Sequence, residues 1–283
     1  MKPIIKYRGG KSKEISRLIP YIPQYEGRYI EPFFGGGAMF FHLEPDNAII
    51  NDINKRLIDF YKYVQQHYDI LTIELMQLEE IYTKHRNTYE ELKKIHPNDK
   101  VLDENETLYY ELRDMYNGLK SSNYSDAALY YFINKTAYSG MIRYNAKGEY
   151  NVPYGRYKNF NTRIITEAHH KLLVKTEIHN KDYQEIFNLV NPNDFVFLDP
   201  PYDCIFSDYG NVEYSDGFTE ENHRRLATDF FNLGCRALMV IGDTPLIREL
   251  YRNNIIAKYD KNYSVNIRNR FQAEATHLII TNY

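Results

Sequence analysis

Residues 195–202 read Phe-Val-Phe-Leu-Asp-Pro-Pro-Tyr, and this stretch carries the strongest structural signal in the chain. Its apolar first half is typical of a short buried strand. Asp199 then lies at the carboxyl end of that strand, where open α/β sheets bind their ligands. The two prolines fix their own φ angles and lack N–H donors, but their carbonyls can still accept hydrogen bonds. The Asp199 carboxylate and the Pro200 carbonyl can therefore hold one small amino group together, with the Tyr202 ring beside it to stack on a planar base.

Length and composition set wider limits. The chain has 283 residues, enough for one large or two small domains with a packed core. No apolar run approaches the ~20 residues that span a bilayer, and the N-terminus has no hydrophobic signal region. Cys204 and Cys235 are too few for a disulfide framework, and no Cys/His cluster has the spacing of a zinc site. We therefore expect a cytoplasmic protein with no membrane association and no bound metal.

Charge is unevenly distributed along the chain. The formal net charge is −3, yet residues 1–17 and residues 134–163 each hold six Lys/Arg against a single Glu. Residues 64–126 hold thirteen Asp/Glu against seven Lys/Arg. Because phosphate contact needs only a local basic face, the net charge does not exclude a nucleic-acid partner. Two solvated surface segments would give the same pattern.

The hydrophobic pattern predicts an α/β sheet domain interrupted by a mostly helical insertion. Strands are expected at 28–30, 48–52, 176–180, 195–199, 237–242 and 276–281, with helices near 220–233 and 245–253. Thr244 and Pro245 are the expected N-cap and first residue of the last helix. Between the second and third strands, apolar residues recur at spacings of three and four, the stripe of amphipathic helices; these are Leu71, Leu75, Leu78, Ile81 and then Leu108, Leu112, Met115, Leu119.

Two glycine-rich stretches need to be weighed. Gly9-Gly10-Lys11-Ser12 ends like a phosphate-binding P-loop, but Ile5 stands where its first glycine is required. Gly35-Gly36-Gly37 follows a predicted strand and lacks the third glycine of the dinucleotide fingerprint. Asp52 nevertheless ends the next strand, where a carboxylate can hold two ribose hydroxyls. These residues favour a nucleoside-containing cofactor without separating NAD from S-adenosylmethionine.

The order of the motifs along the chain favours S-adenosylmethionine over NAD as the cofactor. Lys6-Tyr7-Arg8-Gly9-Gly10-Lys11, Glu31-Pro32-Phe33-Phe34-Gly35-Gly36-Gly37, Asn51-Asp52-Ile53-Asn54, Lys181-Asp182-Tyr183 and Asp199-Pro200-Pro201-Tyr202 follow one another along the chain. This sequence closely resembles the Dam-type (α-group, D12 class) DNA adenine-N6 methyltransferases over nearly its whole length. The resemblance implies a Rossmann-like, class I S-adenosylmethionine-dependent methyltransferase sheet with an inserted target-recognition domain. It places the catalytic domain at 1–58 and 165–283, and the recognition domain at 59–164.

The resemblance also implies roles for individual residues. S-adenosylmethionine, which leaves as S-adenosylhomocysteine, would contact residues in all five motifs: Tyr7, Lys11, Phe33, Gly35, Gly37, Asp52, Asp182, Tyr183 and Asp199. Within this set Tyr7 would stack near the cofactor adenine and Asp52 would hold the ribose. Asp199, Pro200 and Tyr202 would form the catalytic pocket around adenine N6. Because N6 is buried in a duplex, the base must be flipped out to reach that pocket.

Residues 134–158 resemble the DNA-reading hairpin of the family. By that match Tyr138 and Ser139 would wedge into double-stranded DNA, and Met141 and Arg143 would meet base edges. The other expected DNA contacts are Lys6, Arg8, Asn145 and Arg156. Arg143 is the best candidate for direct readout, because arginine pairs bidentately with guanine. Family members that methylate GATC usually carry Asn-Gly after the aromatic residue, whereas this chain has Ser139; the target site stays open, with GATC slightly favoured.

Other activities fit fewer of these residues. A DNA cytosine-N4 methyltransferase shares the pocket chemistry but usually begins its motif with Ser. A glutamine-modifying protein methyltransferase usually has Asn in place of Asp199, and an NAD-dependent dehydrogenase explains only the glycine turn. A non-catalytic DNA-binding module on the same fold is a further alternative. The expected protein is a monomer that could work beside a restriction endonuclease in a restriction–modification system.

Overall fold

The computed structural model describes residues 1–7, 9–203, 218–261 and 275–283, and the chain forms two compact units. The first, here called the helical unit, consists of Met1–Ser12, Gly35–Glu44 and Asn54–Lys175. The second, the sheet unit, consists of Lys13–Phe34, Pro45–Ile53 and Thr176–Tyr283. The helical unit thus includes the N-terminal segment and the glycine turn as well as most of the predicted insertion.

The sheet unit is built on a seven-stranded mixed sheet in the order β3-β2-β1-β4-β5-β7-β6. Strands β3, β2, β1, β4 and β5 are parallel, and β7 runs antiparallel to both β5 and β6. The strands are β1 (Tyr29–Glu31), β2 (Ala48–Asn51), β3 (Thr176–His179), β4 (Phe195–Leu198), β5 (Arg236–Gly242), β6 (Ile255–Lys261) and β7 (Ala275–Thr281). This confirms the predicted Rossmann-like fold class and the predicted strands, and it adds β6.

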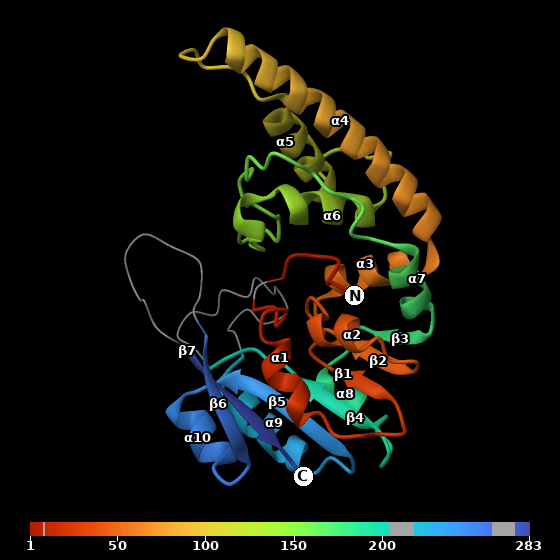
Figure 1. The fold of residues 1–283 in the computed structure, drawn as a ribbon, viewed down its shortest axis with the longest axis vertical. Helices are drawn as coiled ribbons and strands as arrows, with labels where there is room; N and C mark the ends of the chain where they lie inside the picture. The colour runs from red at the N-terminus through yellow and green to blue at the C-terminus, as the bar shows by residue number, and fades with distance from the viewer. Residues whose placement is uncertain (8, 204–217, 262–274) are drawn as a thin grey trace. The chain divides into compact units, whose positions relative to one another are not determined.

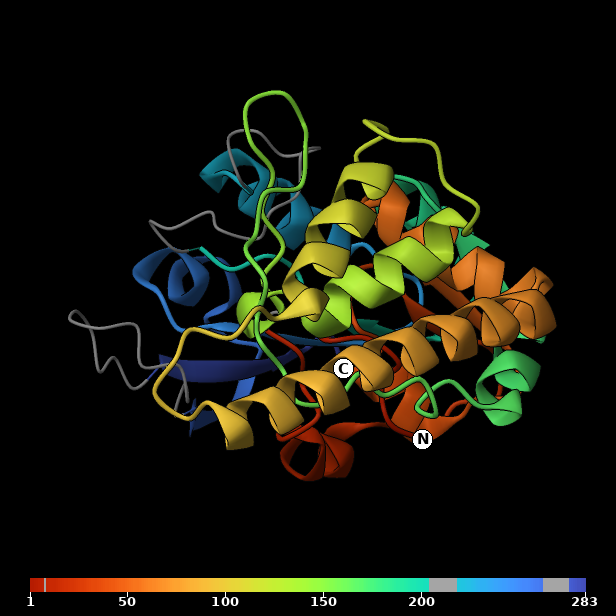
Figure 2. The same cartoon turned by 90° about the horizontal axis from the view of Figure 1, so that it is seen from above.

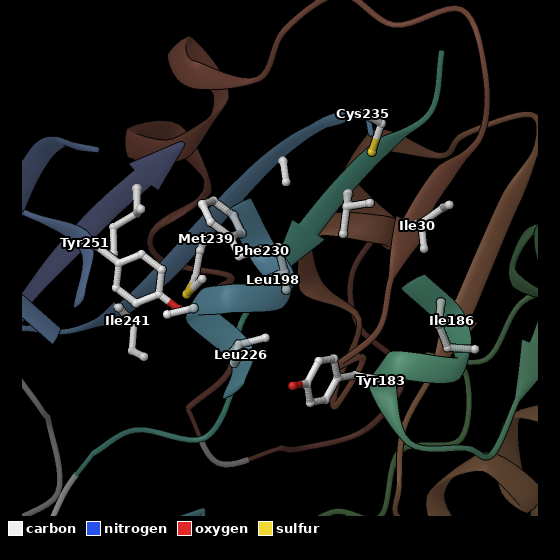
Figure 3. Close-up of a cluster of buried hydrophobic side chains, with 14 of the residues drawn as sticks. Ile30, Tyr183, Ile186, Leu198, Leu226, Phe230, Cys235, Met239, Ile241 and Tyr251 are labelled. Carbon is white, nitrogen blue, oxygen red and sulfur yellow. The ribbon is translucent and has the colours of Figure 1, made fainter. Parts of the chain in front are cut away.

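The central strands are buried on both faces. Every residue of β1, β2 and β4 is buried, as expected for parallel strands covered by helices on both sides. Figure 3 shows the core on one face, where side chains from the strands meet those of the helices; its labelled members are Ile30, Tyr183, Ile186, Leu198, Leu226, Phe230, Cys235, Met239, Ile241 and Tyr251. The apolar run of β4 is therefore explained by its place in the middle of the sheet.

Helices α8 (Tyr183–Phe187), α9 (Glu220–Phe231) and α10 (Pro245–Tyr251) connect strands of this sheet. The helix α1 (Ile15–Leu18) and the 3-10 helix η1 (Ile19–Tyr21) precede β1. The Thr244 hydroxyl accepts a hydrogen bond from the Ile247 amide, and Pro245 opens α10. The predicted helix start at Thr244-Pro245 is confirmed.

The helical unit contains α2 (Ala38–Leu43), α3 (Lys55–Gln66), α4 (Tyr68–Ile95), α5 (Glu104–Tyr116), α6 (Asp126–Thr136), the 3-10 turn η2 (Tyr138–Gly140) and α7 (Glu167–Val174). Helices α3–α7 lie between β2 and β3 in the chain. Figure 1 shows α4 as the longest of them, with α5 and α6 packed along it. No helix in the described ranges is both long and apolar enough to cross a membrane.

The apolar stripe was predicted largely correctly for α4 and only partly for α5. Leu71, Leu75 and Leu78 are buried on α4, but Tyr82 is buried there in place of the half-buried Ile81. On α5 the buried side chains are Asn105, Tyr109 and Leu112, and Leu119 lies beyond the helix with 61% of its surface exposed. The predicted burial was therefore right for Leu112 and wrong for Leu108, Met115 and Leu119. The buried face turns instead toward Tyr109, whose hydroxyl bonds the Val152 carbonyl at 2.8 Å.

Candidate active site

The carboxyl ends of the parallel strands bring several predicted site residues to one edge of the sheet unit. Phe33 follows β1, Asp52 follows β2, Asp182 follows β3 and Asp199 follows β4. Because these four strands run in the same direction, the residues after them lie at the same edge. The topology therefore groups a catalytic candidate with three cofactor candidates.

The Tyr202 ring is fixed by contacts on two neighbouring strands. It meets the His277 ring of β7 edge to face, with 5.1 Å between centroids. A Cβ added to Gly242, the last residue of β5, would lie 3.2 Å from the Tyr202 ring, so glycine leaves the space that the ring needs. Tyr202 thus has a defined place beside Asp199, as a stacking surface requires.

Three residues missed by the sequence analysis support this ring from behind. His277 Nδ1 lies 3.0 Å from Glu14 Oε2, and the Tyr259 hydroxyl donates to the same carboxylate at 2.5 Å. Both His277 and Glu14 are buried. Burial, followed by the hydrogen bond to Glu14, raises the pKa of Tyr259 well above its ordinary value, so its hydroxyl keeps its proton. Since these partners are far apart in the chain, no local pattern could have identified them.

Asn51, next to the predicted ribose-binding Asp52, ties together the ends of three strands. Its side chain donates to the carbonyls of Pro32 at 2.9 Å and Lys181 at 3.0 Å, and accepts from the Lys181 amide at 2.9 Å. Asn180 completes the arrangement by donating to the Asp52 carbonyl at 2.8 Å. Asp52 itself is buried. The backbone around the Asp52 carboxylate is therefore held from both neighbouring strands.

Asp182 and Tyr183 are engaged within the sheet unit. Asp182 caps α8 through the Gln184 amide at 2.9 Å and pairs with Arg225 at 3.2 Å. The Tyr183 hydroxyl donates to Asp229 at 2.7 Å, and its ring contacts the Phe33 ring with 5.3 Å between centroids. The structure thus brings Phe33 and Tyr183 together, with the Tyr183 side chain almost fully buried.

The other cofactor candidates, Tyr7, Lys11, Gly35 and Gly37, belong to the helical unit. The Tyr7 ring lies against the glycine turn, since a Cβ on Gly35 would come within 2.9 Å of it. Gly35 has a φ of +50°, a conformation that few residues other than glycine adopt. Lys11 Nζ donates to the Gly9 carbonyl at 3.0 Å. The glycine turn is therefore shaped around Tyr7 in this unit.

The predicted DNA-reading hairpin begins directly after α6 and projects from its end, as Figure 2 shows for the long green loop. Its arms pair at Tyr144–Tyr150, and the Asn151 amide donates to the Arg143 carbonyl at 3.1 Å. Tyr138 at its base is 56% exposed. The hairpin shape is confirmed, since Ala137 also pairs with Tyr154, while residues 134–136 form the last turn of α6; a role in reading DNA stays a prediction.

The polar residues of the hairpin are held by one another. Arg143 is exposed and donates to the Asn151 side chain at 2.7 Å and to its carbonyl at 3.1 Å. Asn145 organises the turn, because its side-chain oxygen accepts from the amides of Lys147 and Glu149. Met141 is half-buried. Arg156, an exposed residue, pairs with Glu106 at 3.0 Å.

Ser139 and Gly140 both have left-handed backbone conformations, with φ of +54° and +60°. Asparagine and glycine are the residues that tolerate this region best. This geometry gives a physical reason for the Asn-Gly pair of the GATC-methylating members. Ser139 therefore adopts this conformation at a higher cost than asparagine would.

Lys6 is anchored to the end of α6. Its backbone exchanges two hydrogen bonds with the Asn134 side chain, at 2.8 and 2.7 Å, and its ammonium donates to the Lys135 carbonyl. The Lys6 ammonium also lies 3.9 Å from the centre of the Tyr157 ring. Lys135 donates to the Ile4 carbonyl, and burial together with the nearby Lys6 charge lowers the pKa of Lys135 to about 8. Arg8, the remaining predicted DNA contact, lies outside the described residues.

A seven-stranded sheet with an antiparallel β7, a glycine turn after β1 and an acid-Pro-Pro-aromatic motif after β4 are together typical of an α/β methyltransferase. Residues 7–265 match the family described as D12 class N6 adenine-specific DNA methyltransferase, and the chain belongs to that family. It is therefore an adenine-specific DNA methyltransferase, as the motif order predicted.

Curated relatives agree with this assignment. The chain is 38% identical to the Type II methyltransferase M.CviBI of Paramecium bursaria Chlorella virus NC1A, with both chains covered completely. It is 32% identical to the Type II methyltransferase M.MjaIII of Methanocaldococcus jannaschii, over 100% of this chain and 99% of that one. Against the retron Ec67 DNA adenine methylase of Escherichia coli the identity is 30%, covering 89% of this chain and 81% of the relative.

Proposed function

We propose that this protein transfers the methyl group of S-adenosylmethionine to N6 of an adenine that is flipped out of a short specific site in double-stranded DNA. The observation that carries the proposal is the common edge of the sheet unit, where Asp199 follows β4 and Asp52 follows β2. An acid placed to accept hydrogen bonds from an amine and an acid placed to hold a ribose are what this reaction requires.

The residues present fit an adenosine-containing methyl donor. Asp52 offers a carboxylate for the two ribose hydroxyls, and Gly35 and Gly37 have positive φ angles in a turn that keeps side chains away from the backbone. Phe33 and Tyr183 form an aromatic wall in the sheet unit. When bound, S-adenosylmethionine supplies a methyl group activated by its sulfonium. We assign Tyr7, Lys11 and Asp182, with the residues above, to holding it.

The acceptor base would be held by the motif after β4. The Asp199 carboxylate and the Pro200 carbonyl would accept hydrogen bonds from the two N6 hydrogens, and the adenine would stack on Tyr202. The N6 lone pair is delocalised into the ring, so two acceptors help by favouring a more tetrahedral nitrogen. They also stabilise the positive charge that grows on it. Fixing the Tyr202 ring between Gly242 and His277 reduces the freedom that binding must remove.

Recognition is assigned to residues 59–164 as a target-recognition domain, with catalysis assigned to 1–58 and 165–283. In this division the hairpin reads the duplex through Arg143 and Met141, while Tyr138 and Ser139 enter the space left by the flipped base. Lys6, Arg8, Asn145 and Arg156 would contact DNA around them. The exposure of Tyr138 and Arg143 supports this assignment.

The cellular setting is also part of the proposal. The relatives named Type II methyltransferases support a role beside a restriction endonuclease. We propose that the protein acts as a cytoplasmic monomer, for which light scattering of the purified protein is the direct measurement. GATC is the favoured target among short adenine-containing sites.

Mapping modified bases tests the reaction and the target together. The chain is expressed in a host whose own adenine methyltransferases are deleted, and single-molecule sequencing reads the modified bases. N6-methyladenine should occur in one short motif and should be absent with Asp199→Ala. N4-methylcytosine instead would favour the cytosine-N4 alternative, and unmodified DNA in the presence of folded protein would contradict the proposal.

A further inference from the structure

Arg56, in the first turn of α3, lies between two tyrosine rings of the helical unit. Its guanidinium carbon is 4.8 Å from the centre of the Tyr116 ring on α5 and 4.9 Å from that of Tyr144 in the hairpin. Both distances are within the range of a cation–π contact. One side chain thus connects α3, α5 and the arm of the hairpin that carries Arg143.

The surroundings of Arg56 show that Tyr116 and Tyr144 are its main partners, through their rings and their hydroxyls. Its Nη1 atom is buried and has no hydrogen-bond partner in the part of the chain that the structure describes. The hydroxyls of Tyr116 and Tyr144 lie 3.3 Å apart, which joins the two rings at their tips. Burial, together with the neighbouring Tyr144, raises the pKa of Tyr116 well above its ordinary value, so this tyrosine stays neutral. Arg56 is half-buried, and its buried Nη1 atom lies where the two tyrosine rings, rather than water, surround it.

The same arm of the hairpin is anchored from its other side. The Tyr150 hydroxyl donates to the Met141 carbonyl at 2.6 Å, and Asn117 holds the Tyr150 backbone by two hydrogen bonds of 3.0 and 2.8 Å. Tyr144 pairs with Tyr150 across the hairpin. Arg56 therefore completes a set of contacts that fixes residues 141–150 before any DNA is bound.

We propose that Arg56 is a positioning residue for sequence recognition, which acts by holding Tyr144 and thereby placing the neighbouring Arg143. This inference rests on the proposed function, since it takes the hairpin to be the element that reads DNA. Arg56 needs no contact with a base in this role. Its effect reaches the DNA through the hairpin backbone.

The experiment compares Arg56→Ala and Arg56→Lys with Lys55→Ala. Lys55 precedes Arg56 on the same helix and is 69% exposed, with a salt bridge to Asp59, so it serves as the matched control. The main readout is the ratio of kcat/KM on the preferred duplex to kcat/KM on duplexes with one changed base pair. Arg56→Ala should lower this ratio about three- to thirtyfold, the range expected when one or two cation–π contacts are lost. The ratio for Arg56→Lys should lie between those of the parent and Arg56→Ala, because lysine keeps the charge without the planar stacking group. The ratio for Lys55→Ala should equal that of the parent.

Amide hydrogen exchange gives a second readout that needs no DNA. Exchange at residues 141–151 should be faster in Arg56→Ala than in Lys55→Ala, with α4 unchanged. Tyr144→Leu removes the ring from the hairpin side and should reproduce both effects, which keeps the inference testable if Arg56→Ala does not fold. Unchanged discrimination together with unchanged exchange in these variants would overturn the positioning role.

Arg143→Ala, measured in the same assays, separates the two proposals. If Arg143→Ala lowers discrimination and the Arg56 and Tyr144 variants do not, then base readout by Arg143 is supported and positioning by Arg56 is wrong. If Arg143→Ala leaves discrimination intact while the Arg56 variants lower it, Arg56 still positions the hairpin, and the assigned reader is wrong.

Discussion

The carboxyl edge of the sheet unit and the hairpin of the helical unit hold their functional residues by different means. Asp199 follows a strand whose four residues are all buried, and its neighbours are fixed by the strand order. Arg143 lies on a two-armed loop, where its guanidinium bonds Asn151 and its neighbour Tyr144 contacts Arg56. The position of the acid is thus a property of the sheet, whereas the position of the arginine depends on a few replaceable contacts. On the proposed roles, a change at the hairpin should alter the target sequence while the chemistry at Asp199 stays the same.

The largest effect on activity is expected from a substitution of Asp199, at the carboxyl edge of the sheet. Asp199→Ala should lower kcat by about 100- to 1,000-fold or more, because it removes an acceptor placed for the transition state. Binding of S-adenosylmethionine, measured by calorimetry, should stay detectable. Full methylation activity in this variant would contradict the role of Asp199.

Asp194, just before the amino end of the same strand, is the matched control for that variant. Its carboxylate pairs with Arg28 at 2.7 Å and accepts the Arg28 amide. Asp194→Ala should lower the free energy of unfolding and leave kcat close to the parent value. Equal losses of kcat in the two variants would mean that Asp199 acts only through stability.

A smaller effect is expected at the hairpin. Arg143→Ala should cost about 1–3 kcal/mol of discrimination at one base pair, with little change in the salt dependence of binding. Binding to duplexes with every single-base change, at two salt concentrations, measures both quantities. Arg156→Ala, which removes an exposed arginine paired with Glu106, should instead weaken binding to all sequences alike. A uniform loss in Arg143→Ala would assign Arg143 to the phosphates.

Lys135, which links α6 to the N-terminal segment through the Ile4 carbonyl, should make the free energy of unfolding depend on pH. Burial lowers the pKa of Lys135 to about 8, below its value in the unfolded chain, so the unfolded state binds more protons between the two values. The free energy of unfolding should therefore rise with pH above about 8, by up to about 1.4 kcal/mol per pH unit. Urea unfolding of the parent and of Lys135→Met from pH 7 to 10 isolates this contribution, which Lys135→Met should lack. Parallel curves for the two proteins would show that Lys135 has an ordinary pKa.

The smallest effect concerns the left-handed turn. Ser139→Asn should stabilise the protein by about 0.5 kcal/mol, since asparagine tolerates a positive φ better than serine. Ser139→Ala, without a polar side chain to bond locally, should be less stable than the parent. Thermal unfolding of the three proteins gives the ranking. A lower midpoint for Ser139→Asn would show that the Ser139 side chain makes a contact that asparagine cannot replace.

Local patterns predicted much of the sheet unit. The apolar run at Phe195–Leu198 and the cap at Thr244-Pro245 are short-range signals, and both appear where expected. Strand β6 was missed, because Ile255–Lys261 alternates only weakly and carries charged residues at one end. Its place is set by pairing with β7, which no local pattern shows.

Polar contacts between residues far apart in the sequence could not be predicted at the site. Glu14 and His277 come from opposite ends of the chain, yet they share a hydrogen bond behind Tyr202. Nothing in the sequence near Arg56 indicated a special role. Its contacts with Tyr116 and Tyr144 form only in the folded chain, because these residues are distant in the sequence. The motif resemblance indicated the chemistry, but the contacts that fix each side chain depend on tertiary structure.

The hydrogen bonds between Arg143 and Asn151 have a consequence for how the enzyme searches DNA. While both are made, the guanidinium is committed to the hairpin and offers fewer donors to passing guanines. We therefore expect the protein to slide over non-cognate sequence through phosphate contacts alone. Transient hydrogen bonds between Arg143 and guanines outside the target site should then slow this sliding very little. Asn151→Ala would remove the bond to the Asn151 side chain and keep the one to its carbonyl. With the arginine held less firmly, the distance travelled along DNA per encounter should shorten, as measured by methylation of two sites on one molecule.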